Sequence, residues 1–161
     1  GHRLIEEDAI NALTQELMPL SSLITPNLSE AEVLTGHRMD NVEKMKIAAP
    51  ELLKYGCGAA LLKGGHLEGG KMCDVLQIAG EEKPHLFVSD KIESKNTHGT
   101  GCTLSSAIAT FLALGYDMPQ AVEHAKAYVT GGIHAGKDIH IGEGHGPLNH
   151  FYAPVPMKII R

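Results

Sequence analysis

The chain has 161 residues, and its 14 Lys and Arg against 19 Asp and Glu give a formal charge of −5. This length suits one domain, since a chain of about 150 residues can bury roughly 70% of its unfolded surface. The mild acidity, without any run of Lys or Arg, argues against nucleic acid as a partner. The 3 cysteines form no CxxC pair, so they predict no disulfide framework and favour a reducing compartment, the cytoplasm.

Two stretches bear on targeting. Residues 1–8 have mixed charges and no apolar core, so they do not read as a secretory signal. The stretch 96–116 lacks Asp, Glu, Lys and Arg, but its Asn, Thr, His and Ser side chains are too costly in hydrocarbon for a membrane span. The sequence therefore predicts neither export nor a membrane partner.

Helical and extended patterns alternate from the N-terminus. Apolar residues four apart over 4–17 predict an amphipathic helix. The apolar run 22–25 ends at a proline and predicts a buried strand. Ser29 is placed to cap a short helix over 30–35 that stops at Gly36.

A longer helical pattern comes next. Asp40 and Glu43 have the spacing of a capping box and open a pattern that runs to Leu52. Pro50 falls inside this pattern and predicts a kink or a break of the helix.

Three short apolar runs then predict strands over 58–62, 74–78 and 86–89. The pair Gly64-Gly65 is expected to close the first of them. The second and third are separated by a charged, turn-like segment, so we expect them to pair with each other.

Two antiparallel helices joined by a short turn are expected in the second half of the chain. The first covers 102–114 and ends at Gly115, and the second begins near Pro119. Alternating strand and helix signals indicate an α/β fold, with helices covering a sheet whose main strands pair in parallel.

The most informative stretch is Asn96-Thr-His-Gly-Thr-Gly-Cys102, because it joins a predicted strand to a predicted helix through two glycines. Amides at a helix start have no intrahelical partner and, with the helix dipole, bind phosphate. Gly99 and Gly101 allow close approach and a positive φ, and Thr100 adds a hydroxyl donor. The spacing is neither GxGxxG nor GxxxxGK[ST], so a phosphate site of another class is predicted.

Cys102 falls in the first turn of the predicted helix, where the dipole and the free amides favour a thiolate. A thiolate at this place can act as a base. The alternative is that Cys102 is a small buried residue and that the glycines only make a tight turn. Cys57 and Cys73 do not lie at a glycine-rich helix start and are interpreted as structural.

Asn27 and Glu30 follow the first predicted strand with the spacing N-x-x-E. One helical turn brings the amide and the carboxylate together, a pair suited to hydrated Mg²⁺ beside phosphates. The alternative is a helix N-cap with an ordinary glutamate in the first turn. Lys63 lies just past another predicted strand, where a lysine can neutralise charge on a transferred phosphoryl group; a surface lysine is the alternative.

Four segments together resemble the hydroxymethylpyrimidine/phosphomethylpyrimidine kinases of thiamine biosynthesis: Thr25-Pro-Asn-Leu-Ser-Glu-Ala-Glu32, Lys63-Gly-Gly-His66, Cys73-Asp-Val75 and Asn96-Thr-His-Gly-Thr-Gly-Cys102. Any one of them alone is a weak signal, but their order and spacing agree. The resemblance extends to the opening residues 1–4 and the closing residues 144–151.

The resemblance implies a ribokinase-like α/β fold, a sandwich of helices around a mostly parallel sheet. It implies ATP-dependent phosphorylation of 4-amino-5-hydroxymethyl-2-methylpyrimidine and then of its monophosphate. Cys102 would be the general base, where many ribokinase-like enzymes have an aspartate. Gly99, Thr100 and Gly101 would line the anion hole.

By the same resemblance, Asn27, Lys63 and Thr97 contact the nucleotide, and Asn27 and Glu30 hold Mg²⁺. The implied cofactors are ATP and Mg²⁺, and the implied partner is a small-molecule pyrimidine.

Members of this family carry a longer N-terminal portion, with a glycine-rich opening, several strands and most of the pyrimidine contacts. We therefore expect residues 1–161 to be the C-terminal part of one kinase domain that lacks its N-terminal strands. Such a part exposes an unpaired sheet edge, so we expect a homo-oligomer or association with the N-terminal portion, and no turnover by this part alone. The alternatives are a pyridoxal or pyridoxine kinase on the same scaffold and a non-catalytic nucleotide-binding module.

Overall fold

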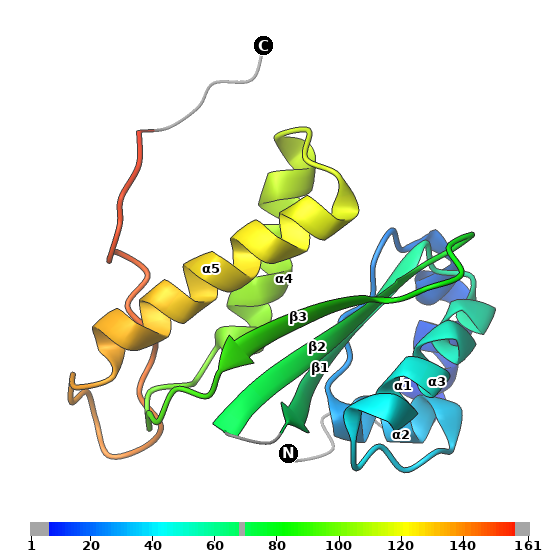
Figure 1. Cartoon of the computed structure of the whole chain (residues 1–161), viewed down its shortest axis with the longest axis horizontal. Coiled ribbons are helices and arrows are strands. Elements are labelled where there is room, and N and C mark those ends of the chain that lie inside the picture. The colour runs from blue at the N-terminus through cyan, green and yellow to red at the C-terminus, as the bar shows by residue number, and fades with distance from the viewer. Residues whose placement is uncertain (1–6, 68–69, 157–161) are drawn as a thin grey trace. The chain divides into compact units, whose positions relative to one another are not determined.

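The computed structural model describes residues 7–67 and 70–156 (Figure 1). Its internal contacts divide the chain into two compact units, residues 1–91 and residues 92–161. Within the described ranges, no helix combines the length and the apolar character that crossing a membrane requires.

The first unit contains a three-stranded antiparallel sheet in the order β1 (Ala59–Leu67), β2 (Lys71–Ile78) and β3 (His85–Asp90). The predicted local pairing of 74–78 with 86–89 is confirmed. The prediction that the main strands pair in parallel is wrong for these three, because consecutive strands with short connections can only pair antiparallel.

Parallel pairing occurs instead along residues 21–27, which lie beside β1 as an extended segment. The Ile24 amide donates to the Ala59 carbonyl (3.0 Å), and the Leu61 amide donates to the Ile24 carbonyl (2.8 Å). The strand predicted over 22–25 is therefore present as extended chain that is paired with β1 through isolated bridges.

β1 passes through Gly64-Gly65, where the sequence predicts its end. Its register with β2 shifts between Leu62 and Gly65, and Gly64 has a φ of 92°. A left-handed glycine at a bulge lets the strand continue, so the predicted end at these glycines is wrong.

The N-terminal helical segment has three consecutive pieces: α1 (Glu7–Ala12), a π-helical turn (Leu13–Leu17) and a 3₁₀ turn (Met18–Leu20). They account for the described part of the helix predicted over 4–17; residues 4–6 lie outside the described residues. The predicted burial of its apolar face is not found at Leu17, which is 56% exposed, whereas Met18 is buried.

α2 (Leu28–Thr35) begins at Asn27 and not at the predicted cap Ser29. The Asn27 side chain accepts a hydrogen bond from the Glu30 amide, and the Glu30 side chain accepts one from the Asn27 amide. These two bonds form a complete capping box. Asn27 therefore satisfies the first amides of the helix. The helix ends, as predicted, at Gly36 with a φ of 73°.

α3 (Val42–Leu52) continues through Pro50 and passes into a 3₁₀ turn at Leu53–Tyr55. The helix does not break at Pro50, so that part of the prediction is wrong. Pro50 lies in the last turn, where the missing N–H removes only one hydrogen bond of the helix.

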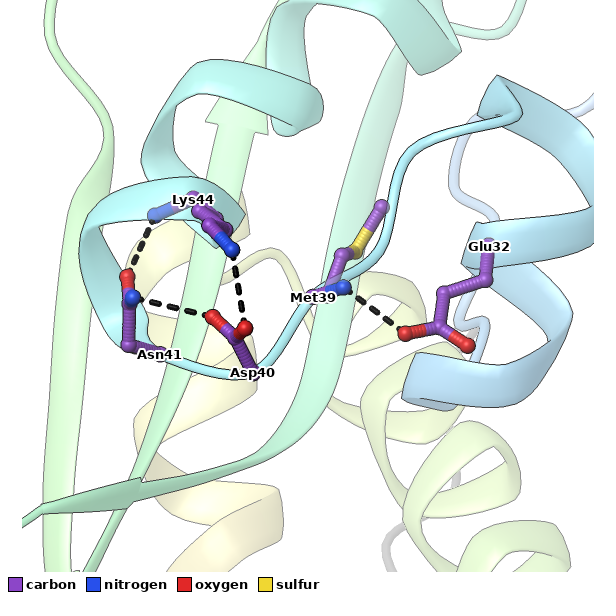
Figure 2. Close-up of polar contacts among 5 residues, drawn as sticks. All are labelled: Glu32, Met39, Asp40, Asn41 and Lys44. Carbon is purple, nitrogen blue, oxygen red and sulfur yellow. Dashed lines mark hydrogen bonds and ion pairs between the residues drawn. The ribbon is translucent and has the colours of Figure 1, made fainter.

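The start of α3 differs from the predicted capping box (Figure 2). Asn41 is the cap, since its Oδ1 accepts the Lys44 amide at 2.9 Å. Lys44 Nζ donates a hydrogen bond to Asp40 Oδ2 at 2.8 Å, and this bond holds the pKa of Asp40 below its ordinary value. The Met39 amide donates to Glu32 Oε1 at 2.7 Å and ties this loop back to α2.

The core of the first unit lies between the sheet and the helices α2 and α3 (Figure 1). Its most buried side chains, each no more than 1% exposed, include Ala31, Met45, Ala48, Ala49, Leu52, Leu62, Cys73 and Val75. Burial of this apolar area holds in place β1 and α2, the elements that carry Lys63, Asn27 and Glu30.

The second unit contains α4 (Thr100–Ala113) and α5 (Met118–Gly136), which pack against each other. Gly115 has a φ of 92° in the turn between them, and α5 opens with a capping box between Asp117 and Gln120. The predicted pair of helices with a short connection is confirmed.

Residues 148–152 lie against the glycine-rich end of α5 and form the C-terminal strap. A Cβ on Gly132 would lie 2.9 Å from the side chain of Leu148, and a Cβ on Gly131 would lie 2.4 Å from the ring of Tyr152. Leu148 is only 3% exposed. Glycine is therefore required where the strap meets the helix.

Candidate functional site

The segment before α4 is a loop. β3 ends at Asp90, so the direct strand-to-helix junction that the sequence predicts is not present. The loop closes with a turn in which the Thr100 amide donates to the Thr97 carbonyl at 3.3 Å. Gly99 is the N-cap of α4 with a φ of 84°, a left-handed conformation that favours glycine.

The first turn of α4 presents free backbone donors. The Thr103 amide donates to the Gly99 carbonyl at 2.9 Å. The amides of Gly101 and Cys102 have no acceptor among the described residues. Because α4 is 14 residues long, these donors coincide with the positive end of a substantial helix dipole, which suits an anion.

A buried side chain holds this loop in place. Asn96 is 7% exposed, and its Nδ2 donates to the carbonyls of Gly136 (2.6 Å) and Ile139 (2.5 Å). A Cβ on Gly146 would lie 2.1 Å from Asn96 Oδ1, and the His98 amide donates to the Gly146 carbonyl at 3.1 Å. No role for Asn96 or Gly146 was predictable, because a contact between residues fifty positions apart leaves no local signal in the sequence.

Cys102 is exposed on the first turn of α4. The alternative in which this residue is a small buried side chain therefore does not describe the structure. Cys57 and Cys73 are buried, which agrees with their interpretation as structural residues, and burial raises the pKa of the Cys57 thiol. Thr97 is exposed beside the same turn.

The first unit brings Asn27, Glu30 and Lys63 together. Asn27 and Lys63 form a parallel bridge, and the Lys63 amide donates to the Pro26 carbonyl at 3.0 Å. The capping box joins Glu30 to Asn27 through two bonds of 2.8 and 2.9 Å. The N-cap interpretation of the N-x-x-E spacing is thus correct as a description of the geometry.

The same residues can also contribute to a magnesium site. The capping box occupies one carboxylate oxygen of Glu30, and in the described part of the chain no partner occupies the other. No cluster of three or more His, Cys, Asp or Glu that could hold a metal is found within residues 7–67 and 70–156. A single carboxylate fits Mg²⁺ that is bound mainly by phosphate oxygens and water.

The predicted residues thus form two groups, Asn27, Glu30 and Lys63 in the first unit and Thr97 with 99–102 in the second. The first group offers a cation and a carboxylate. The second offers free amides and an exposed thiol. Together these are the chemical groups that phosphoryl transfer uses.

Solved structures that superpose on this chain include pyridoxal and phosphomethylpyrimidine kinases, and the fold class is ribokinase-like. Pyridoxal kinase from Bacillus subtilis, solved as an ADP complex, superposes with a TM-score of 0.80 at 33% identity, over 90% of this chain and 54% of that chain. Phosphomethylpyrimidine kinase from Clostridium difficile 630 superposes with a TM-score of 0.64 at 39% identity, over 81% of this chain and 51% of that chain.

Residues 1–149 match the model of the phosphomethylpyrimidine kinase family, and the chain belongs to this family. The thiamine biosynthesis bifunctional protein ThiED of Geobacter sulfurreducens is 46% identical over 153 residues, which are 95% of this chain and 30% of that protein. The hydroxymethylpyrimidine/phosphomethylpyrimidine kinase of Rhizobium meliloti is 42% identical, over 94% of this chain and 57% of that protein. The chain therefore spans little more than half the length of the latter relative. The resemblance and the fold class expected from the sequence are confirmed.

Proposed function

We propose that this chain carries the phosphate-binding and catalytic part of an enzyme that phosphorylates the hydroxymethyl group of 4-amino-5-hydroxymethyl-2-methylpyrimidine and then its monophosphate. The phosphoryl donor is ATP. One observation carries the proposal: the thiol of Cys102 is exposed in the turn of α4 whose Gly101 and Cys102 amides have no acceptor among the described residues. A base and an anion site are thereby adjacent in the chain.

The reaction is an in-line displacement. The Cys102 thiolate takes the proton of the substrate hydroxyl, the hydroxyl oxygen forms a bond to the γ-phosphorus, and the bond from that phosphorus to ADP breaks. The amides of Gly99, Gly101 and Cys102, with the Thr100 hydroxyl, stabilise negative charge on the transferred group. Preorganised donors at a helix start act without reorienting during the reaction.

The residues of the first unit act on the nucleotide. Lys63 neutralises charge on the phosphates, and Asn27 contacts the nucleotide. Thr97, which belongs to the second unit, is also proposed to contact the nucleotide. Asn27 and Glu30 would hold Mg²⁺, which, when bound, supplies further neutralisation of the phosphate oxygens.

Pyridoxal phosphorylation is the second candidate activity. Pyridoxal kinase of Staphylococcus aureus in complex with AMP-PCP superposes with a TM-score of 0.82 at 29% identity, above the value for the phosphomethylpyrimidine kinase structure. Higher identity to pyrimidine kinases favours the first candidate. A nucleotide-binding module without catalysis is the third outcome that an assay must separate.

The association and location of the protein are also proposals. We propose that residues 1–161 form the C-terminal part of one kinase domain, and that they associate with an N-terminal portion or with a second copy. Light scattering of the purified chain measures this association directly. We place the protein in the cytoplasm, since it exposes the thiol of Cys102 that an oxidising compartment would consume.

ADP release by the complete encoded protein tests the function with three substrates: the pyrimidine alcohol, its monophosphate and pyridoxal. Turnover of the two pyrimidines is expected. Cys102→Ala should lower kcat about 10²–10³-fold and leave ATP affinity unchanged, while Ser106→Ala, on the exposed face of the same helix, should change neither. ATP binding without ADP release from any substrate favours the module, and near-normal kcat in Cys102→Ala removes Cys102 as the base.

A further inference from the structure

β1 contains a bulge at the lysine of the proposed site. Its register with β2 shifts between Leu62 and Gly65, so that Lys63 and Gly64 lie opposite the single residue Asp74. An extra residue in one strand interrupts the ladder and redirects the side chains around it. The backbone from which Lys63 projects is therefore set by whatever holds this bulge.

Asp74 holds the bulge from the neighbouring strand. Its side chain is 7% exposed, and its Oδ1 accepts the amide of Gly64 at 2.7 Å. The carboxylate thus supplies the acceptor for an amide that the register shift removes from the ladder. This bond is charge-assisted, a kind roughly twice as strong as a neutral one.

Gly64 is needed here for its backbone. It has a φ of 92°, and a Cβ on it would meet nothing within 4 Å. Space would allow a side chain, but the left-handed conformation favours glycine. The turn thus depends on the Gly64 conformation and on the Asp74 acceptor.

The opposite side of Lys63 is fixed independently. Its amide donates to the Pro26 carbonyl at 3.0 Å, and it forms a parallel bridge with Asn27. Lys63 is thereby held between the segment that leads to the capping box and the bulge that Asp74 stabilises. A change at Asp74 would release the second of these constraints and leave the first in place.

We propose that Asp74 is a positioning residue for Lys63: its carboxylate holds the bulge and so fixes the lysine beside Asn27 and Glu30. The proposal rests on the proposed function, in which Lys63 neutralises charge on the transferred phosphoryl group. It gives a role to the Cys73-Asp-Val75 motif, whose aspartate the mechanism otherwise leaves unused.

The test is a double-mutant cycle of Lys63→Ala and Asp74→Ala in the complete encoded protein, with kcat for ADP release at saturating substrates as the readout. Lys63→Ala should lower kcat about 10²-fold. Asp74→Ala should lower it about tenfold, because a misplaced charged group loses part of its effect on the barrier. In the Lys63→Ala background, Asp74→Ala should lower kcat less than about twofold, since a positioning residue has nothing left to position.

Two variants separate positioning from general stability. Asp74→Asn keeps an Oδ1 acceptor for Gly64 and should restore kcat to within about threefold of the unmodified protein. Gln77→Ala removes another buried polar side chain of β2, one that is 2% exposed and donates to the Ile78 and Glu81 carbonyls. It should lower the melting temperature and leave kcat unchanged.

Losses that multiply in the double variant overturn the proposal, because Asp74 would then act without Lys63. Unchanged kcat in Lys63→Ala overturns the role of Lys63 in the proposed function, and the inference falls with it. If Asp74→Ala does not fold, Gly64→Ala replaces it in the cycle, since a strained φ disturbs the same turn. The same non-multiplicative pattern is then expected, and multiplicative losses again refute the proposal.

Discussion

Replacement of Asn96 tests whether one buried amide supports the loop that precedes α4. Its Nδ2 donates to two carbonyls, those of Gly136 and Ile139. Asn96→Ala removes both bonds and leaves both carbonyl oxygens without this donor. At about 1–2 kcal/mol for each bond, the free energy of unfolding should fall by about 2–4 kcal/mol.

Asn96→Asp makes the sharper test because it keeps the shape of the side chain. The carboxylate cannot donate, and it places negative charge against the two carbonyl oxygens. At neutral pH the loss should exceed that of Asn96→Ala and reach about 3–5 kcal/mol, the range for an uncompensated buried charge. Lowering the pH should recover part of this loss, because a protonated carboxyl again supplies one donor.

Urea denaturation followed by circular dichroism measures both losses in the complete encoded protein. Asn11→Ala is the matched control, since it removes the same atoms from an exposed position of α1 and should change stability by less than about 0.5 kcal/mol. A loss below about 1 kcal/mol for Asn96→Asp would show that the two hydrogen bonds do not hold the loop.

Three further results are expected. Asn27→Ala removes the cap of α2 and should lower the free energy of unfolding by about 1 kcal/mol in urea denaturation; no change would contradict the capping box. The hydrogen bond from Lys44 lowers the pKa of Asp40, so the stabilising effect of this bond is present above the ordinary Asp pKa and is lost as pH falls through the lowered pKa. In Lys44→Met, the pKa of Asp40 measured by NMR titration should rise towards its ordinary value, and an unchanged pKa would contradict this cause. A thiol reagent should label Cys102 quickly and the buried Cys57, whose pKa is raised, only after denaturation; equal rates would contradict the burial difference.

Features that depend on neighbouring residues were predictable from the sequence. Gly36 and Gly115 end or follow helices with a positive φ, as a C-terminal glycine predicts. The prediction that Ser29 caps α2 was wrong because Asn27 lies two residues earlier and forms a capping box with Glu30. Two competing caps so close together differ by too little energy for spacing alone to decide.

Features that depend on distant partners were not predictable. Gly64-Gly65 has the composition of a strand end, yet Asp74 on the next strand converts it into a bulge inside the strand. Asn96 likewise belongs to a recognised motif, but its two acceptors lie 40 and 43 positions later in the chain. The candidate residues were therefore identifiable from their motifs, whereas the contacts that position them were not.

The glycine-rich end of α5 has a consequence for the order of folding. Gly131, Gly132 and Gly136 together lower helix propensity by about 3 kcal/mol relative to alanine, so this end of the helix is weak on its own. Its compensating contacts come from Leu148 and Tyr152, which leave the ribosome later. The first turns of α5 can form from local sequence, while its last turns, and the Asn96 loop that they anchor, can be completed only after residues 148–152 have been synthesised.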